Sequence, residues 1–136
     1  EAKLKSVKRV VLCSGKIYVD LVSSKFRAEA KNVALVRVEQ IYPFPTSDLI
    51  PVIERYTSAE EIVWAQEEPE NMGAWEFARP LLTELIDGRM PLRYLGRPRS
   101  SSPAEGSAAA HNYNQAALIE QAFKQEVNEA AGIIIK

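Results

Sequence analysis

The residues most able to do chemistry lie between positions 61 and 75, where an apolar run leads into an acidic turn. Residues 62–64 are typical of a buried strand, and Glu67, Glu68 and Glu70 follow them. Paired carboxylates can serve as general acid and base, or bind Mg²⁺. Neighbouring side chains on an extended chain point to opposite faces, so Glu67 and Glu68 do not have to converge. We expect one acidic residue to cap the next helix or to pair with an arginine, and the others to be solvated.

A second candidate is the turn of Cys13, Ser14, Gly15 and Lys16, between a strand-like run and a helical pattern. Backbone amides at such a helix start can hold an anion, and a cysteine there can become a reactive thiolate. The turn lacks the upstream glycine and the spacing of a phosphate-binding loop. We favour a simpler interpretation, in which Ser14 caps the helix and Cys13 packs beneath it.

His111 is the single histidine and Cys13 the single cysteine, which excludes a structural zinc site and an internal disulfide. No sequence pattern places a nucleophile beside His111, for which we expect a capping or surface role. One unpaired cysteine also fits a reducing compartment.

The best sequence candidate for binding a phosphorylated ligand is the segment 93–103, which combines Arg93, Arg97 and Arg99 with a tyrosine and several serines. Arginines on a connecting loop are also what an interface with an acidic partner uses, and this is the interpretation that we favour. A solvated loop is the third interpretation.

These segments are positioned by a regular alternation of strand and helix patterns. Short apolar runs, typical of strands buried on both faces of a parallel sheet, cover residues 9–13, 33–38, 61–65 and 92–96. Apolar residues at helical spacing predict helices over 17–28, 46–56, 74–87 and 114–128. Four such repeats predict an α/β fold with a mostly parallel sheet and helices on both faces.

The composition is that of an ordinary globular domain. The 136 residues include 17 basic and 18 acidic side chains, so the overall charge does not point to nucleic acid or to an anionic membrane surface. No apolar run approaches the ~20 residues that span a bilayer. We expect neither nucleic acid nor a membrane as a partner.

Four motifs in a fixed order carry a resemblance to a known family: VVLCSGKIY at 10–18, VRVEQIYPFP at 36–45, WAQEEPENMGAW at 64–75 and GRPRSSSP at 96–103. Together they resemble the C-terminal domain of the decarboxylating component of 2-oxoglutarate dehydrogenase, over residues 8–124. The resemblance implies a three-layer α/β/α domain similar to the transketolase C-terminal domain. We accordingly expect a linker remnant at 1–7, the domain at 8–128 and a disordered tail at 129–136.

In that family the parent enzyme binds thiamine diphosphate and Mg²⁺, decarboxylates 2-oxoglutarate and passes the succinyl group to lipoyl-lysine. The cofactor lies between the two preceding domains, and its GDG…N motif is absent from this sequence. The resemblance therefore implies no catalytic, cofactor-binding or metal-binding residue here. It implies three partners: the preceding catalytic domains, the second subunit of a homodimer and the dihydrolipoyl succinyltransferase complex. The resemblance also implies a location in the mitochondrial matrix if the source is eukaryotic, or in the cytoplasm if it is bacterial, and leaves open whether the parent enzyme's substrate is 2-oxoglutarate or the related 2-oxoadipate.

The loop at 42–45 and the turn at 71–75 both follow strands, so we expect them on one edge of the sheet. That edge would dock onto the catalytic domains or the second subunit. The alternative is that Phe44 and Trp75 fill this domain's own core. The interface candidates are Tyr42, Phe44, Glu67, Glu68, Asn71, Met72 and Trp75.

Some members of the family that the sequence resembles are regulated by acetyl-CoA or adenine nucleotides. The candidate residues for binding such a ligand here are Arg93, Arg97 and Arg99. The rival hypothesis is a free-standing α/β module. Such a module would bind a nucleotide or an anion at residues 13–16 or at the arginine loop.

Overall fold

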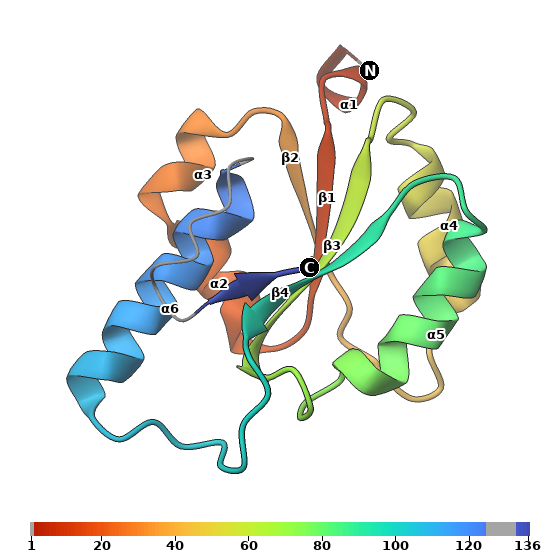
Figure 1. Ribbon diagram of the computed structural model, residues 1–136. Helices are drawn as coiled ribbons and strands as arrows, with labels where there is room; N and C mark the ends of the chain where they lie inside the picture. Colours follow the sequence, from red (N-terminus) through yellow and green to blue (C-terminus); the bar gives the residue numbers. More distant parts are fainter. Residues whose placement is uncertain (1, 125–132) are drawn as a thin grey trace.

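A computed structural model describes residues 2–124 and 133–136 of the chain. Its centre is a five-stranded sheet with the order β2-β1-β3-β4-β5 (Figure 1). The first four strands are parallel, and the last runs antiparallel to its neighbour. The strands are β1 (Arg9–Cys13), β2 (Val33–Arg37), β3 (Glu61–Pro69), β4 (Leu92–Arg97) and β5 (Ile134–Ile135).

Helices cover both faces of this sheet. The six helices described are α1 (Ala2–Lys5), α2 (Lys16–Ser23), α3 (Lys25–Glu29), α4 (Thr46–Glu54), α5 (Trp75–Ile86) and α6 (Ala108–Phe123). In Figure 1, α2, α3 and α6 lie on one side of the sheet and α4 and α5 on the other, which gives three layers. This arrangement confirms the predicted α/β fold with a mostly parallel sheet.

The central strands are buried from both sides. All five residues of β1 are buried. Alternate side chains point to opposite faces, so Val10 and Trp64 belong to the apolar cluster under α4 and α5. Val11 and Val63 belong to the cluster under α2 and α6. This two-sided burial explains why the strands are continuous apolar runs in the sequence.

Two helices differ from the sequence prediction because serine side chains cap them. The helix expected over 17–28 is divided at Ser24, whose hydroxyl accepts the backbone N–H of Phe26 and begins α3. The last helix begins at Ala108 rather than near 114, since the hydroxyl of Ser107 accepts the N–H of Ala110. Its predicted continuation over 125–128 lies outside the described residues.

Both ends of the chain differ from the expected linker and tail. Residues Ala2–Lys5 form α1, and Val7 is buried in the cluster under α4 and α5. At the other end Ile133 is buried and Ile134–Ile135 pairs with β4, so residues 133–136 belong to the sheet and not to a disordered tail. Residues 129–132 lie outside the described residues. The cause at both ends is the burial of apolar side chains, because such burial fixes the backbone beside them.

Arg9 brings a charge into the interior, where it is 1% exposed. Its Nε donates to Glu61 Oε1 at 2.6 Å. Its Nη1 donates to carbonyls at 3.0, 3.2 and 2.7 Å, which belong to Gln121, Ala122 and Lys124. The last carbonyls of a helix have no partner within it. One guanidinium therefore closes the end of α6 and ties it to β1 and β3.

Glu61 holds a second arginine, because Arg93 Nη1 donates to its other oxygen at 2.9 Å. Burial would raise the pKa of Glu61, but the hydrogen bonds and charges of Arg93 and Arg9 outweigh it and hold this pKa below its usual range. The ion pairs therefore stabilise the fold fully above the unfolded-state pKa of about 4.3. This stabilisation is lost as the pH falls through the lower folded-state pKa.

We predict that Arg9→Met lowers the free energy of unfolding by about 3 kcal/mol at pH 7, because the end of α6 and one Glu61 oxygen lose their partner. Urea unfolding followed by circular dichroism measures this loss, which shrinks below about pH 4 as Glu61 is protonated. Lys8→Met is the matched control, since the Lys8–Glu60 pair is exposed and its loss costs less than about 1 kcal/mol. Equal losses for the two variants would contradict this role of Arg9.

Candidate functional site

The carboxyl ends of the parallel strands meet at one edge of the sheet, and the turn after β3 is organised there by Gln66. This side chain is 4% exposed. Its Oε1 accepts the indole N–H of Trp64 and the backbone N–H of Trp75, both at 3.0 Å. Its Nε2 donates at 3.2, 3.0 and 2.8 Å to the carbonyls of Glu68, Pro69 and Met72. One amide therefore fixes both the turn and the first residue of α5.

For one of Glu67, Glu68 and Glu70 the sequence predicts a cap on α5 or a pair with an arginine, and among the described residues neither contact is found. The N–H of the first helical residue, Trp75, is satisfied by Gln66. Glu67 accepts a hydrogen bond from Gln115 at 2.7 Å, and Glu70 pairs with Lys136 at 3.0 Å. The sequence prediction failed because a buried amide within the strand supplies the cap.

Trp75 lies inside this structure and not at its surface. Its side chain is 6% exposed, and its ring centroid is 5.4 Å from that of Tyr94. Of the two interpretations of Trp75, the structure therefore supports the one in which it fills the domain's own core. An aromatic residue at a helix start suits either role, and only the rotation of α5 on the sheet decides between them.

Tyr94 explains why a glycine interrupts β4. Its hydroxyl donates to the carbonyl of Arg97 at 2.6 Å and lies 3.3 Å from that of Glu68. Burial raises the pKa of Tyr94, so this hydroxyl stays a donor. A Cβ at Gly96 would lie 2.4 Å from the hydroxyl, and only glycine leaves room for it. The contact joins the ends of β3 and β4.

Exposed aromatic side chains at this edge come from the loop after β2 and from α5. Tyr42 is 82% and Phe77 is 42% exposed, and their ring centroids are 6.2 Å apart. Phe44 is half-buried and lies 6.5 Å from Phe77 in an edge-to-face arrangement. We call Tyr42, Phe44 and Phe77 the aromatic cluster. The sequence interpretation missed Phe77, although its place between the buried Trp75 and Ala78 puts it on the outer side of an amphipathic helix.

The remaining interface candidates of the turn have different environments. Glu68 is exposed and Met72 is half-buried. Asn71 exchanges two hydrogen bonds with the backbone of Ser100, its Nδ2 donating at 2.9 Å and its Oδ1 accepting at 3.0 Å. Asn71 therefore joins the turn after β3 to the loop after β4.

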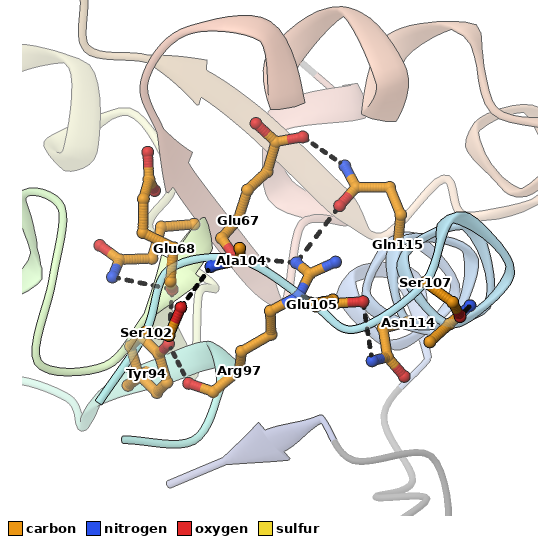
Figure 2. A network of polar contacts seen from close by, with 12 residues as sticks. Glu67, Glu68, Tyr94, Arg97, Ser102, Ala104, Glu105, Ser107, Asn114 and Gln115 are labelled. Carbon is orange, nitrogen blue, oxygen red and sulfur yellow. Dashed lines mark hydrogen bonds and ion pairs between the residues drawn. The ribbon is translucent and has the colours of Figure 1, made fainter. Parts of the chain in front are cut away.

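Arg97 and Glu67 belong to a polar network between the sheet and α6 (Figure 2). Arg97 is 7% exposed; its Nε pairs with Glu105, and its Nη1 donates to the Glu67 carbonyl at 2.8 Å. Gln115 donates to the carboxylates of Glu67 and Asp20 at 2.7 and 3.2 Å. Burial would raise the pKa of Glu105, but the hydrogen bond and charge of Arg97 outweigh it and lower this pKa. Arg97 is thus neutralised by an ionised carboxylate.

The three predicted arginines do not form one site. Arg93 pairs with Glu61 near the start of β4, whereas Arg97 ends that strand. Arg99 is exposed and pairs with Glu76 at 2.7 Å.

Arg97 Nη2 has no hydrogen-bond partner among the described residues. The hollow beside Arg97, of about 240 Å³, is also lined by Arg99, Ser100, Ser102 and Glu105. Binding of a regulatory ligand there stays a prediction.

Cys13 ends β1 with a fully buried side chain in the cluster under α2 and α6. Burial raises the pKa of its thiol to about 12, and the charge of Arg37 offsets only part of this effect. The thiol is therefore protonated at neutral pH, which argues against an activated thiolate. The predicted packing of Cys13 is confirmed, but the prediction that Ser14 caps the helix is wrong. The residue before α2 is Gly15, at φ 77°, and no side chain caps this helix start.

His111 lies exposed in the first turn of α6, in agreement with a surface role. Residues 2–124 and 133–136 contain no group of three or more His, Cys, Asp or Glu side chains that could hold a metal ion. Within the same residues, no helix is long and apolar enough to cross a membrane.

Comparison with known proteins identifies the family of this domain. The sequence model of the 2-oxoglutarate dehydrogenase C-terminal family matches residues 1–123. The chain belongs to this family. Residues 1–7, predicted to be a linker outside the domain, fall within the match, in agreement with α1 and the buried Val7.

Individual relatives agree with the family match. The 2-oxoglutarate dehydrogenase E1 component of Cupriavidus necator is 46% identical over 123 residues, which are 90% of this chain and 13% of that protein. The same component of an Exiguobacterium species is 46% identical over 89% of this chain and 13% of its own length. That of Haemophilus influenzae is 44% identical over 88% of this chain, again 13% of its length. The chain thus spans about 13% of the length of these relatives.

We predict that in this 2-oxoglutarate dehydrogenase C-terminal domain Gln66→Leu lowers the free energy of unfolding by about 3 kcal/mol or more. The reason is that the indole N–H of Trp64 and the backbone N–H of Trp75 stay buried without a partner. Urea unfolding measures the loss. Gln40→Leu is the control, because Gln40 is exposed and its Nε2 donates a hydrogen bond to the Pro43 carbonyl at 2.9 Å. A loss below about 1 kcal/mol for Gln66→Leu would show that its hydrogen bonds are not decisive.

We also predict that Cys13 of the native domain reacts with a thiol reagent at pH 8 at least about a hundredfold more slowly than an exposed cysteine, because it is buried and protonated. The control is Cys13→Ala combined with Val19→Cys, since Val19 is 54% exposed. Absorbance of the released chromophore follows both reactions. Similar rates for the two thiols would contradict the buried, protonated state.

Proposed function

We propose that this chain is an assembly domain of a thiamine-diphosphate-dependent 2-oxoglutarate dehydrogenase and that it catalyses no step itself. Its docking surface is the carboxyl edge of the sheet. The observation that carries the proposal is the aromatic cluster, in which Tyr42 and Phe77 stay 82% and 42% exposed. The carboxyl edge of an open α/β sheet is where such domains meet ligands and partners.

The aromatic cluster is built on fixed supports. Phe44 packs against the core cluster under α4 and α5. Phe77 projects from the first turn of α5, whose start is fixed by Gln66. Aromatic rings are enriched at the centres of protein interfaces, where a few of them supply most of the binding energy. Rings that are already held in place lose little conformational freedom on docking, which favours affinity.

The family supports a role within a larger enzyme. The relatives are E1 components of 2-oxoglutarate dehydrogenase, and the chain covers 13% of their length. We propose that decarboxylation, with its thiamine diphosphate and Mg²⁺, belongs to the other parts of that enzyme. The proposed partners of the aromatic cluster are the preceding domains of the same polypeptide and the second subunit of a homodimer. The succinyltransferase, which would receive the succinyl group, is a proposed partner of the assembled enzyme.

The test replaces the corresponding domain of the Cupriavidus necator enzyme with this chain and introduces Tyr42→Ser and Phe77→Ser together. We predict that the double variant loses at least about tenfold in its subunit association constant and in turnover, because it loses two interface anchors. The free energy of unfolding of the isolated chain should change by less than about 1 kcal/mol, since both side chains are exposed. Sedimentation, enzyme assays and urea unfolding measure the three quantities.

Val19→Ser combined with Tyr113→Ser is the matched control. These side chains are 54% and 63% exposed and lie on α2 and α6, which cover the face of the sheet opposite α5 (Figure 1). The control should leave association and turnover unchanged. Unchanged association and turnover in the Tyr42→Ser, Phe77→Ser variant would contradict the proposed docking surface.

A further inference from the structure

The strand β5 is attached to the domain differently from the other four strands. The family match ends at residue 123, with the end of α6. Residues 133–136 lie beyond it in the sequence, and β5 pairs with the outer edge of β4 (Figure 1). The four parallel strands and their covering helices therefore lie within the family match, whereas β5 lies outside it.

The pairing has a defined antiparallel register. Gly96 lies opposite Ile134, and Leu95 opposite Ile135. Tyr94 and Lys136 exchange both of their backbone hydrogen bonds, at 3.2 and 2.9 Å. Hydrogen-bonded pairs alternate along an antiparallel ladder, so Gly96 and Ile134 form the next such pair. The outer edge of β4 thus offers amides and carbonyls to an extended segment.

The side chains of this segment have distinct environments. Ile133 is 3% exposed within the cluster that includes α6, and Ile135 packs against the same cluster. Ile134 packs against the cluster on the opposite face of the sheet. Lys136 Nζ lies 3.2 and 3.0 Å from the two carboxylate oxygens of Glu70, whose side chain is 12% exposed. An occupant of this edge is therefore recognised by three apolar residues followed by a cation.

We propose that the outer edge of β4 is a peptide-binding edge. It accepts an extended segment of three apolar residues and a lysine or arginine, antiparallel to β4. Residues 133–136 are its occupant in this chain, bound as an exchangeable segment. Strand addition of this kind draws affinity from backbone hydrogen bonds and specificity from the side-chain environments on alternate faces. An occupied edge also protects β4, because an unpaired strand is a template for aggregation.

The test uses the chain shortened after residue 132, labelled with ¹⁵N, and a synthetic peptide of residues 130–136. The shortened chain is expected to stay folded, because it retains the whole family domain. On addition of the peptide, the amide signals of Tyr94 and Gly96 are expected to shift, since both amides face β5 in this register. A peptide with Ile134→Pro lacks one ladder N–H and is expected to bind at least about tenfold more weakly.

A charge exchange tests the recognition of the cation. The peptide with Lys136→Glu is expected to bind the shortened chain about fivefold more weakly than the original peptide. Glu70→Lys in the shortened chain is expected to reverse this preference. A preference that does not respond to Glu70→Lys would overturn the proposed cation recognition.

Three results would overturn the peptide-binding edge itself. The first is failure of the shortened chain to fold, which would make β5 an integral part of the domain. The second is a peptide that leaves the amide signals of Tyr94 and Gly96 unshifted. The third is equal binding of the Ile134→Pro peptide and the original peptide. The intact chain with Ile134→Pro is an independent check. It is expected to stay folded while the Tyr94 and Gly96 amides exchange with solvent about tenfold faster. Unchanged exchange would also overturn the proposal.

Discussion

A parallel sheet that is covered on both faces leaves polar groups no access to water, so each one inside this domain needs a fixed partner. Arg9 and Gln66 meet this constraint at opposite ends of the central strands. Arg9 binds Glu61 and the last carbonyls of α6 at the amino end. Gln66 binds the backbone of the turn and the start of α5 at the carboxyl end. Because α5 and α6 lie on opposite faces, these two side chains position both helix layers (Figure 1).

The fold class could be predicted from the sequence because strands buried on both faces of the sheet need short, continuously apolar runs, and the helices between them need amphipathic ones. The helix starts at Ser24 and Ser107 were missed, although serine is a preferred cap and gives a local signal for them. The strand β5 could not be predicted from the sequence, because it has only two residues, Ile134–Ile135, and its pairing with β4 joins segments that are far apart in the chain. Tertiary contact, not local preference, decides such short elements.

In the candidate site, too, some features could be predicted from local sequence and others depend on tertiary contacts. The sequence points to the carboxyl edge and to Tyr42 and Phe44, but burial of Trp75 depends on how α5 is rotated against the sheet. Grouping the arginines was misleading for a geometric reason. A strand rises about 3.3 Å per residue, so Arg93 and Arg97 are roughly 13 Å apart along β4. Arg93 therefore pairs with Glu61 at one end of the strand, and Arg97 with Glu105 at the other.

The central claim is that a domain fixed internally by buried polar side chains presents its aromatic cluster to the rest of a 2-oxoglutarate dehydrogenase. Hydrogen exchange of this domain, alone and within the assembled full-length enzyme, tests the claim most directly. If the aromatic cluster is the docking surface, amides of residues 40–46 and 75–79 exchange at least about tenfold more slowly in the assembled enzyme than in the isolated domain. Amides around Val19 and Tyr113 should not change. Equal exchange at residues 40–46 and 75–79 in the two forms would contradict the account.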